Sequence, residues 1–140
     1  MEWLKETLEF RTNGKGLINI TTDLGDLIHK LNVIEGMCFL YIPHASASLT
    51  ISEGYDPSAR GDVENFYERL VPENQSWHQH TLEGKDDSPS HIRSTLTQTN
   101  LTIPVDNGRL SLGRWQAIYL FEHRMHRQLR TVNVRILKAG

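Results

Sequence analysis

Apolar and polar residues alternate over much of this chain, which is the pattern of half-buried β-strands. The first such segment covers residues 3–11, and the turn sequence TNGKG separates it from the apolar stretch LINIT. A continuous apolar run at residues 37–42 predicts a central strand. The last forty residues predict three more strands, with a DNG hairpin turn after the first, at 101–105, 114–122 and 130–137.

Three stretches have the apolar spacing or the capping residues of helices. In the first, Thr22 or Asp23 is the expected cap and Gly36 the expected end. In the third, Ser88 followed by Pro89 is a favourable helix start. The predicted helices cover residues 22–34, 60–70 and 89–96. A mostly antiparallel sheet with these helices is an α+β fold, and the length predicts a single domain over residues 1–140.

Composition narrows the class of protein. Apolar residues make up 38% and charged residues 23% of the chain, and the net charge is −2, as in ordinary globular proteins. The sequence lacks the basic stripe of a nucleic-acid-binding protein and any apolar run of the roughly 20 residues that a membrane span needs. The start MEWLKETLEF has no apolar signal segment, so we expect a cytoplasmic protein. The single cysteine, Cys38, lies in an apolar run and is expected to be inert.

The stretch YIPHASASLTISE, residues 41–53, reads as a strand with an unusual polar side. By the two-residue period, one face carries a histidine and small hydroxyl residues: His44, Ser46, Ser48, Thr50 and Ser52. A pairing of His44 with Ser46 or Ser48 as base and nucleophile is disfavoured, because residues two apart on a strand rarely reach the required hydrogen-bond geometry.

A long polar segment at residues 73–87 is a candidate functional loop, because structureless loops of this length are uncommon in compact domains. It contains His80, and His91 follows on the predicted short helix. Together with His44 these residues could hold a divalent ion such as Zn²⁺, since each offers an imidazole lone pair. The alternative is that the histidines form hydrogen bonds with loop carbonyls or with a substrate.

Two pairs of charged residues carry further hypotheses. Asp86 and Asp87 precede a helix start, where negative charge is favourable in any case, but they could also hold Mg²⁺ for a phosphorylated ligand. Glu122 falls on the same strand face as apolar residues and therefore needs a cationic partner, for which Arg130 is the candidate. That pair could be purely structural.

Glu53 stands where strict alternation would place it on the apolar face. Either the strand ends before this residue, or Glu53 is a partly buried acid with a raised pKa, of the kind that serves as a general base.

Four segments resemble the YjbQ family in order and spacing: HASASLTISEGYDPSARGDVENF, HTLEGKDDSPSHIRS, IPVDNGRLSLGRWQAIYLFEHR and RTVNVRIL. The resemblance runs from about residue 5 to residue 137. It implies an α+β fold, a homotrimer and a clustering of the matched polar residues. The polar row from His44 to Ser52 would then line a site that His80 and His91 close. The implied catalytic residues are His44, Glu53, His80, His91 and Glu122, and the implied substrate-binding residues are Ser46, Ser48, Asp56, Gln116 and Arg130.

The family is often labelled secondary thiamine-phosphate synthase. The resemblance therefore implies a transferase that joins hydroxymethylpyrimidine diphosphate to a thiazole phosphate and releases pyrophosphate, with a small phosphorylated metabolite as substrate. One alternative is a metal-dependent hydrolase or lyase with a histidine-rich site and Glu53 as base. Another is a protein that binds a metabolite or metal without catalysis.

Overall fold

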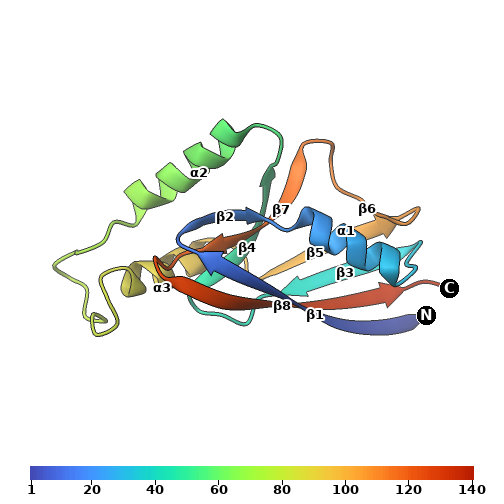
Figure 1. Cartoon of the computed structure of the whole chain (residues 1–140), viewed down its shortest axis with the longest axis horizontal. Coiled ribbons are helices and arrows are strands. Elements are labelled where there is room, and N and C mark those ends of the chain that lie inside the picture. Colours follow the sequence, from blue (N-terminus) through green and yellow to red (C-terminus); the bar gives the residue numbers. More distant parts are fainter.

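A computed structural model describes all residues from Met1 to Gly140 and shows an α+β fold with only antiparallel strand pairs. A five-stranded sheet has the order β1-β8-β3-β5-β6, and a three-stranded sheet has the order β2-β7-β4 (Figure 1). The strands are β1 (Glu2–Asn13), β2 (Gly16–Asn19), β3 (Gly36–Tyr41), β4 (Ala47–Glu53), β5 (Asn100–Asp106), β6 (Arg109–Leu110), β7 (Gln116–Glu122) and β8 (Arg127–Lys138). The helices are α1 (Thr21–Lys30), α2 (Pro57–Leu70) and α3 (Asp87–Leu96).

The three-stranded sheet separates two apolar regions. Its Ile118 and Leu120 face the main core, where 17 buried side chains from both sheets and from α1 pack together. Its Ala117, Tyr119 and Phe121 face α2 and form a smaller cluster. This division confirms the alternation predicted along β7, because the two sets come from opposite faces of one strand.

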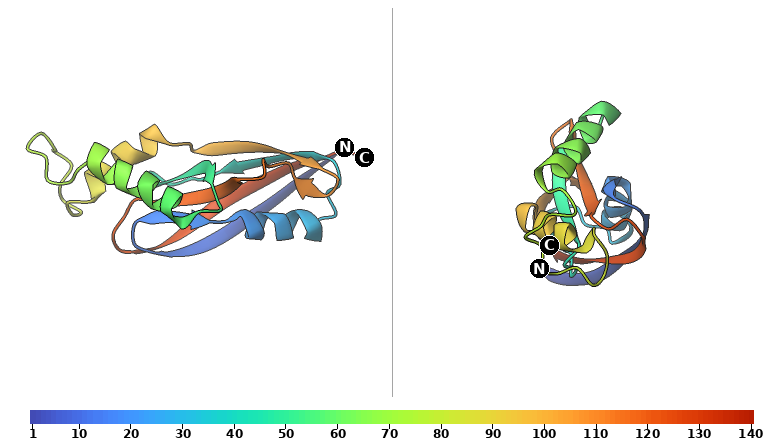
Figure 2. Two further views of the ribbon diagram at one scale, coloured as in Figure 1. Left: turned by 90° about the horizontal axis from the view of Figure 1, so that it is seen from above. Right: turned by 90° about the vertical axis from the view of Figure 1, so that its left-hand side faces the viewer.

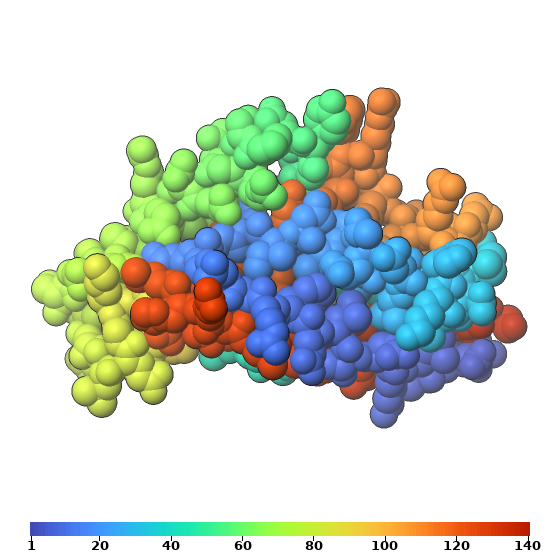
Figure 3. Space-filling model, viewed as in Figure 1, coloured from blue at the N-terminus to red at the C-terminus, as the bar shows by residue number.

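Both chain termini lie at one end of the molecule, and the loop of residues 71–86 extends from the other (Figure 2). In the space-filling view this loop lies beside the turn that precedes β8 (Figure 3). None of the helices is both long and apolar enough to cross a membrane.

The strand predicted over residues 41–53 is wrong in its first part. The structure breaks it after Tyr41, and β4 begins only at Ala47. Pro43 lies in the break, and proline cannot donate a hydrogen bond to a sheet. His44 and Ser46 therefore lie in a connection, and the predicted polar row does not form a single strand face.

The helix boundaries also differ from the predictions. Helix α1 ends at Lys30, short of residue 34, because Asn32 adopts a left-handed conformation with φ of 54°. Gly36 opens β3 instead of ending the helix. Helix α2 starts three residues earlier than predicted, where Asp56 accepts a hydrogen bond from Ser58 N at 2.9 Å. Its exposed face includes Phe66 and Leu70.

The remaining capping predictions need correction as well. The residue before α1 is Ile20, so neither Thr22 nor Asp23 caps that helix. Helix α3 begins at Asp87, and Asp86 takes the cap position predicted for Ser88. These shifts of one or two residues leave the predicted elements in place.

A histidine–carboxylate cluster beside a cavity

A cavity of about 700 Å³ opens where α3 meets the connection between β3 and β4. Volumes of this size are typical of small-molecule sites. Three histidines, two apolar residues and four hydroxyl residues line it: His44, Ala45, His80, Ser88, His91, Ile92, Ser94, Thr95 and Thr99. Helix α3 supplies most of the wall because its first two turns face the cavity.

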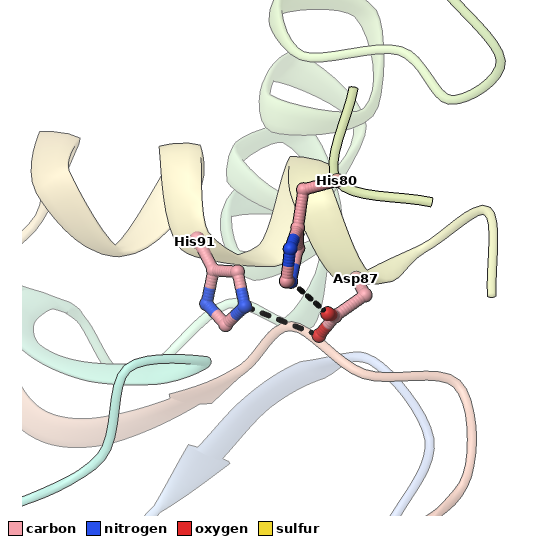
Figure 4. Close-up of side chains that lie close together, drawn as sticks. All are labelled: His80, Asp87 and His91. Carbon is pink, nitrogen blue, oxygen red and sulfur yellow. Dashed lines mark ion pairs between the residues drawn. The ribbon is translucent and has the colours of Figure 1, made fainter. Parts of the chain in front are cut away.

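At one side of the cavity, His80 and His91 point toward the carboxylate of Asp87 (Figure 4). His80 Nε2 lies 2.6 Å from Asp87 Oδ2, and His91 Nε2 lies 3.2 Å from Asp87 Oδ1. The potential ligand atoms of the three residues all lie within 4.8 Å of one another. Asp87 and His91 are four residues apart on α3, so they share one face of the helix.

Hydrogen bonding fixes the orientation of His91. Its Nδ1 lies 2.8 Å from the carbonyl oxygen of Ala45, which can only accept, so Nδ1 carries the proton. In a neutral imidazole the lone pair is then on Nε2, the atom that faces Asp87. A lone pair and a carboxylate oxygen repel each other unless a proton or a cation lies between them. This arrangement of a histidine held from behind by a carbonyl is common among metal ligands.

Asp87 is buried but its hydrogen bonds are incomplete. Oδ1 accepts a hydrogen bond from Arg124 Nη1 at 2.7 Å. Oδ2 is buried and has no hydrogen-bond partner, because the nearby His80 Nε2 does not approach it in hydrogen-bond geometry. A buried carboxylate oxygen without a donor is costly. Oδ2 lies against His80 Nε2, and Oδ1 lies near His91 Nε2, so a cation between the carboxylate and the two imidazoles would satisfy all three groups.

Arg124 holds the neighbouring acid as well. Its Nε donates to Asp86 Oδ2 at 2.9 Å, and the Met125 N–H donates to the same oxygen at 2.9 Å. Burial alone would raise the pKa of Asp86, but the Met125 hydrogen bond and the Arg124 guanidinium outweigh it and lower the pKa. Asp86 is therefore committed to Arg124. The hypothesis that Asp86 and Asp87 form a pair of metal ligands stays a prediction, and only Asp87 of the two lies against the histidines.

His44 lines the same cavity but does not join the cluster. Its Nε2 accepts a hydrogen bond from the Thr131 N–H at 2.9 Å and is not free to bind a metal. Burial, reinforced by the nearby Arg130, lowers the pKa of His44, so its imidazole is neutral at pH 7. The structure brings His80, Asp87 and His91 together and leaves His44 outside this group, and the three-histidine metal set stays a prediction from the sequence.

Glu122 and Arg130 form the buried ion pair that the sequence predicted. Arg130 Nη2 lies 2.6 Å from Glu122 Oε2, and Arg130 Nε donates to Oε1 at 2.8 Å. Thr12 Oγ1 also donates to Glu122 Oε1, and Ser46 Oγ accepts from Arg130. Glu122 is fully buried, with every oxygen occupied. Within this chain Glu122, Arg130 and Ser46 form a structural network, and the catalytic role expected for Glu122 and the substrate-binding roles expected for Arg130 and Ser46 stay predictions.

Glu53, Asp56 and Gln116 lie at the far end of the β4–β7 pair. Ala47 pairs with Glu122 and Glu53 pairs with Gln116, so six residues, or about 20 Å of strand, separate the two ends. Glu53 accepts hydrogen bonds from the Tyr55 and Asp56 N–H groups and closes a turn. Within one chain, Glu53 lies too far from the histidine cluster to act there as a base, and its role as a general base stays a prediction.

Ser48 forms a buried pair with a histidine that the sequence did not single out. Ser48 Oγ lies 2.9 Å from His123 Nε2 and also contacts the Thr97 hydroxyl. Burial, with a contribution from Arg93, lowers the pKa of His123 to about 3. Both side chains are almost fully buried and Ser48 does not line the cavity, so its expected role in substrate binding stays a prediction without support from this geometry. No short-range pattern could reveal this contact, because 75 residues separate the two.

The fold and the site define a small α+β protein with a histidine–carboxylate cluster beside a cavity. A family model described as UPF0047 protein YjbQ-like matches residues 6–139. UPF0047 protein sll1880 of Synechocystis sp. is 42% identical over 94% of this chain and 90% of its own length. UPF0047 protein YjbQ of Escherichia coli O157:H7 is 42% identical over 89% of this chain and 90% of its own length. The chain therefore belongs to the UPF0047 (YjbQ-like) family.

Solved structures agree with this assignment. The conserved hypothetical protein TT1486 from Thermus thermophilus superposes with a TM-score of 0.85 and 34% identity, covering 94% of this chain and 99% of its own. An uncharacterized protein of the family from Clostridium acetobutylicum gives a TM-score of 0.82 and 30% identity. The match covers 96% of this chain and 99% of the Clostridium chain. None of the names of these four relatives states a reaction, so they do not support the thiamine-phosphate synthase label.

Proposed function

We propose that this protein is a metal-dependent enzyme in which His80, Asp87 and His91 bind a transition-metal ion, with Zn²⁺ the best match. The unpartnered, buried Oδ2 of Asp87 carries the proposal, because it faces His80 Nε2 at 2.6 Å without a hydrogen bond. Two imidazole nitrogens and one carboxylate oxygen form a common catalytic zinc set, which leaves a coordination position open.

The chain's own residues support this assignment. Arg124 holds Asp87 from one side, and the Ala45 carbonyl holds His91 from behind. Such outer contacts orient metal ligands and fix the tautomer of the ligating histidine. The cavity lies directly against the histidines and gives a small molecule access to them. Zn²⁺ at this position would supply Lewis-acid activation of water or of a polarised substrate group, which favours hydrolase or lyase chemistry.

The proposal is tested by metal analysis of tag-free protein purified without added metal or chelator. We expect close to one zinc ion per chain, or one-to-one Zn²⁺ binding by calorimetry after chelator treatment. His80→Ala and His91→Ala should each lose the metal, whereas His29→Ala, which removes an exposed histidine on α1, should retain it. Metal-free parent protein that also fails to bind Zn²⁺ would disprove the site, and zinc binding unchanged in His91→Ala would show that it lies elsewhere.

The thiamine-phosphate synthase reaction, the homotrimer, the cytoplasmic location and the phosphorylated substrate stay predictions from the sequence. The reaction is tested by pyrophosphate release after mixing the two thiamine precursors with protein loaded with Zn²⁺ or with Mg²⁺. The exposed Phe66 and Leu70 on α2 support self-association, which sedimentation equilibrium would measure directly. Zinc binding without turnover of any substrate would favour the non-enzymatic alternative.

A further inference from the structure

The cavity wall carries no lysine or arginine. Besides the two proposed metal ligands, its lining consists of His44, two apolar residues and four hydroxyl residues. Proteins hold phosphate with arginine, lysine or the N–H groups of a helix N-terminus. The N-terminus of α3 borders this cavity, but the Asp87 and Ser90 N–H groups there already donate to the Gly84 and Asp86 carbonyl oxygens, and Pro89 has no N–H. Apart from the proposed metal ion, the wall therefore offers a phosphate group no full positive charge.

Two arginines near the cavity, Arg124 and Arg130, already bind carboxylates of the protein. Arg124 binds Asp86 and Asp87, and Arg130 binds Glu122 through two of its nitrogens. His44 adds no charge either, because its Nε2 accepts the Thr131 N–H in the neutral form. Moving either arginine to a ligand would leave a buried carboxylate without its partner, which is unfavourable.

Two of the four hydroxyl groups in the wall are also poorly suited to hold phosphate. Ser94 Oγ donates to the Ser90 carbonyl at 3.0 Å, and Thr95 Oγ1 donates to the Ile92 carbonyl at 2.6 Å. A hydroxyl has a single hydrogen, so these two groups can offer a ligand only lone pairs. A phosphate dianion presents only acceptor oxygens and would meet acceptors here. A ligand with N–H or O–H groups would instead find partners.

We propose that the cavity holds an uncharged polar molecule with hydrogen-bond donors, of the amide or alcohol class. This inference rests on the proposed function in that it names the ligand class of the same site. Ala45 and Ile92 would contact an apolar part of the molecule, while the hydroxyl groups of α3 accept from its donors. Apart from the proposed metal ion, no group of this wall would hold the phosphate of a phosphorylated metabolite.

The experiment compares two probes that share one apolar ring, benzamide and benzyl phosphate. Calorimetry or ligand-observed NMR gives their dissociation constants for the parent, for Thr95→Arg and for Leu96→Arg. Thr95 lines the cavity, while Leu96 is an exposed neighbour on α3 that does not, so the second variant adds the same charge outside the cavity. The zinc content of each sample is measured in parallel, and both zinc-loaded and zinc-free protein are used.

We expect benzamide to bind the zinc-free parent at least about tenfold more tightly than benzyl phosphate. Thr95→Arg should tighten benzyl phosphate by about fivefold and Leu96→Arg should leave it unchanged. Zinc-free parent protein that binds benzyl phosphate as tightly as benzamide, or that does not bind benzamide, would overturn the inference. Absence of zinc in the parent would overturn the proposed metal site alone, because the probe comparison on zinc-free protein still tests the cavity wall.

Discussion

Two buried carboxylates near the cavity differ in how completely they are satisfied. Glu122 has partners for both oxygens: Arg130 twice, the Thr12 hydroxyl and two backbone N–H groups. Asp87 has Arg124 on one oxygen and nothing in hydrogen-bond geometry on the other. The sequence marks both as charged residues beside apolar ones. The comparison teaches that charge and burial alone do not identify a functional acid, whereas an unused oxygen facing other potential ligands does.

The largest expected effect is the loss of stability in Glu122→Ala. This substitution leaves Arg130 buried without its counter-charge and removes the acceptor of Thr12. We expect the free energy of unfolding to fall by about 3–5 kcal/mol, as for other buried ion pairs broken from one side. Urea denaturation measures it, with the exposed Glu9→Ala as a control within about 0.5 kcal/mol of the parent. Equal midpoints for the two variants would refute a structural role for Glu122.

Asp87→Asn should have the opposite effects, with little change in stability and a large loss of zinc affinity. The amide keeps one oxygen for Arg124 and has nearly the same volume, so we expect zinc-free protein to change by no more than about 1 kcal/mol. Zinc affinity should fall by about 100-fold or more, because an anionic ligand becomes neutral. Competition with a fluorescent zinc chelator gives the affinity. Zinc binding at parental strength would remove Asp87 from the ligand set.

The third prediction concerns how the buried His123, which follows Glu122 in the chain, makes the stability of the fold depend on pH. His123 has a pKa of about 3 in the folded protein and an ordinary value near 6.5 when unfolded, so the unfolded chain binds the extra proton between these values. The stability that depends on a neutral His123 is fully present above about pH 6.5. As the pH falls toward 3, the free energy of unfolding decreases by up to about 1.4 kcal/mol per pH unit.

His123→Gln tests this slope, since glutamine can bond to Ser48 but does not titrate in this range. Between pH 6.5 and pH 5, the variant should lose less stability than the parent, as followed by urea denaturation at each pH. The exposed His29→Gln variant should match the parent slope. Parallel slopes for parent and His123→Gln would contradict the burial of a neutral imidazole.

Local pattern predicted the elements better than it predicted the site. The strands and helices follow from alternation and turn residues, and the Glu122–Arg130 pair follows from an acid on an apolar face close to the next strand. The DxxxH spacing of Asp87, just before the predicted helix, and His91 within it was a usable signal for the cluster. The contact of Ser48 with His123 was not predictable, because tertiary packing alone brings these two polar residues together and buries them.

The smallest expected effect is that of Glu53→Gln. This substitution adds to the comparison of Glu122 with Asp87 a third acid, which lies away from the cavity. Glutamine retains an acceptor for the Tyr55 and Asp56 N–H groups, so stability should change by no more than about 0.5 kcal/mol. Zinc affinity should stay within about twofold of the parent, because the strand register places Glu53 six residues from the cluster end of β4. The same chelator competition measures it beside His80→Ala. A clear loss of zinc affinity in Glu53→Gln would mean that Glu53 reaches a cluster in another copy of the chain, since it cannot reach the one in its own.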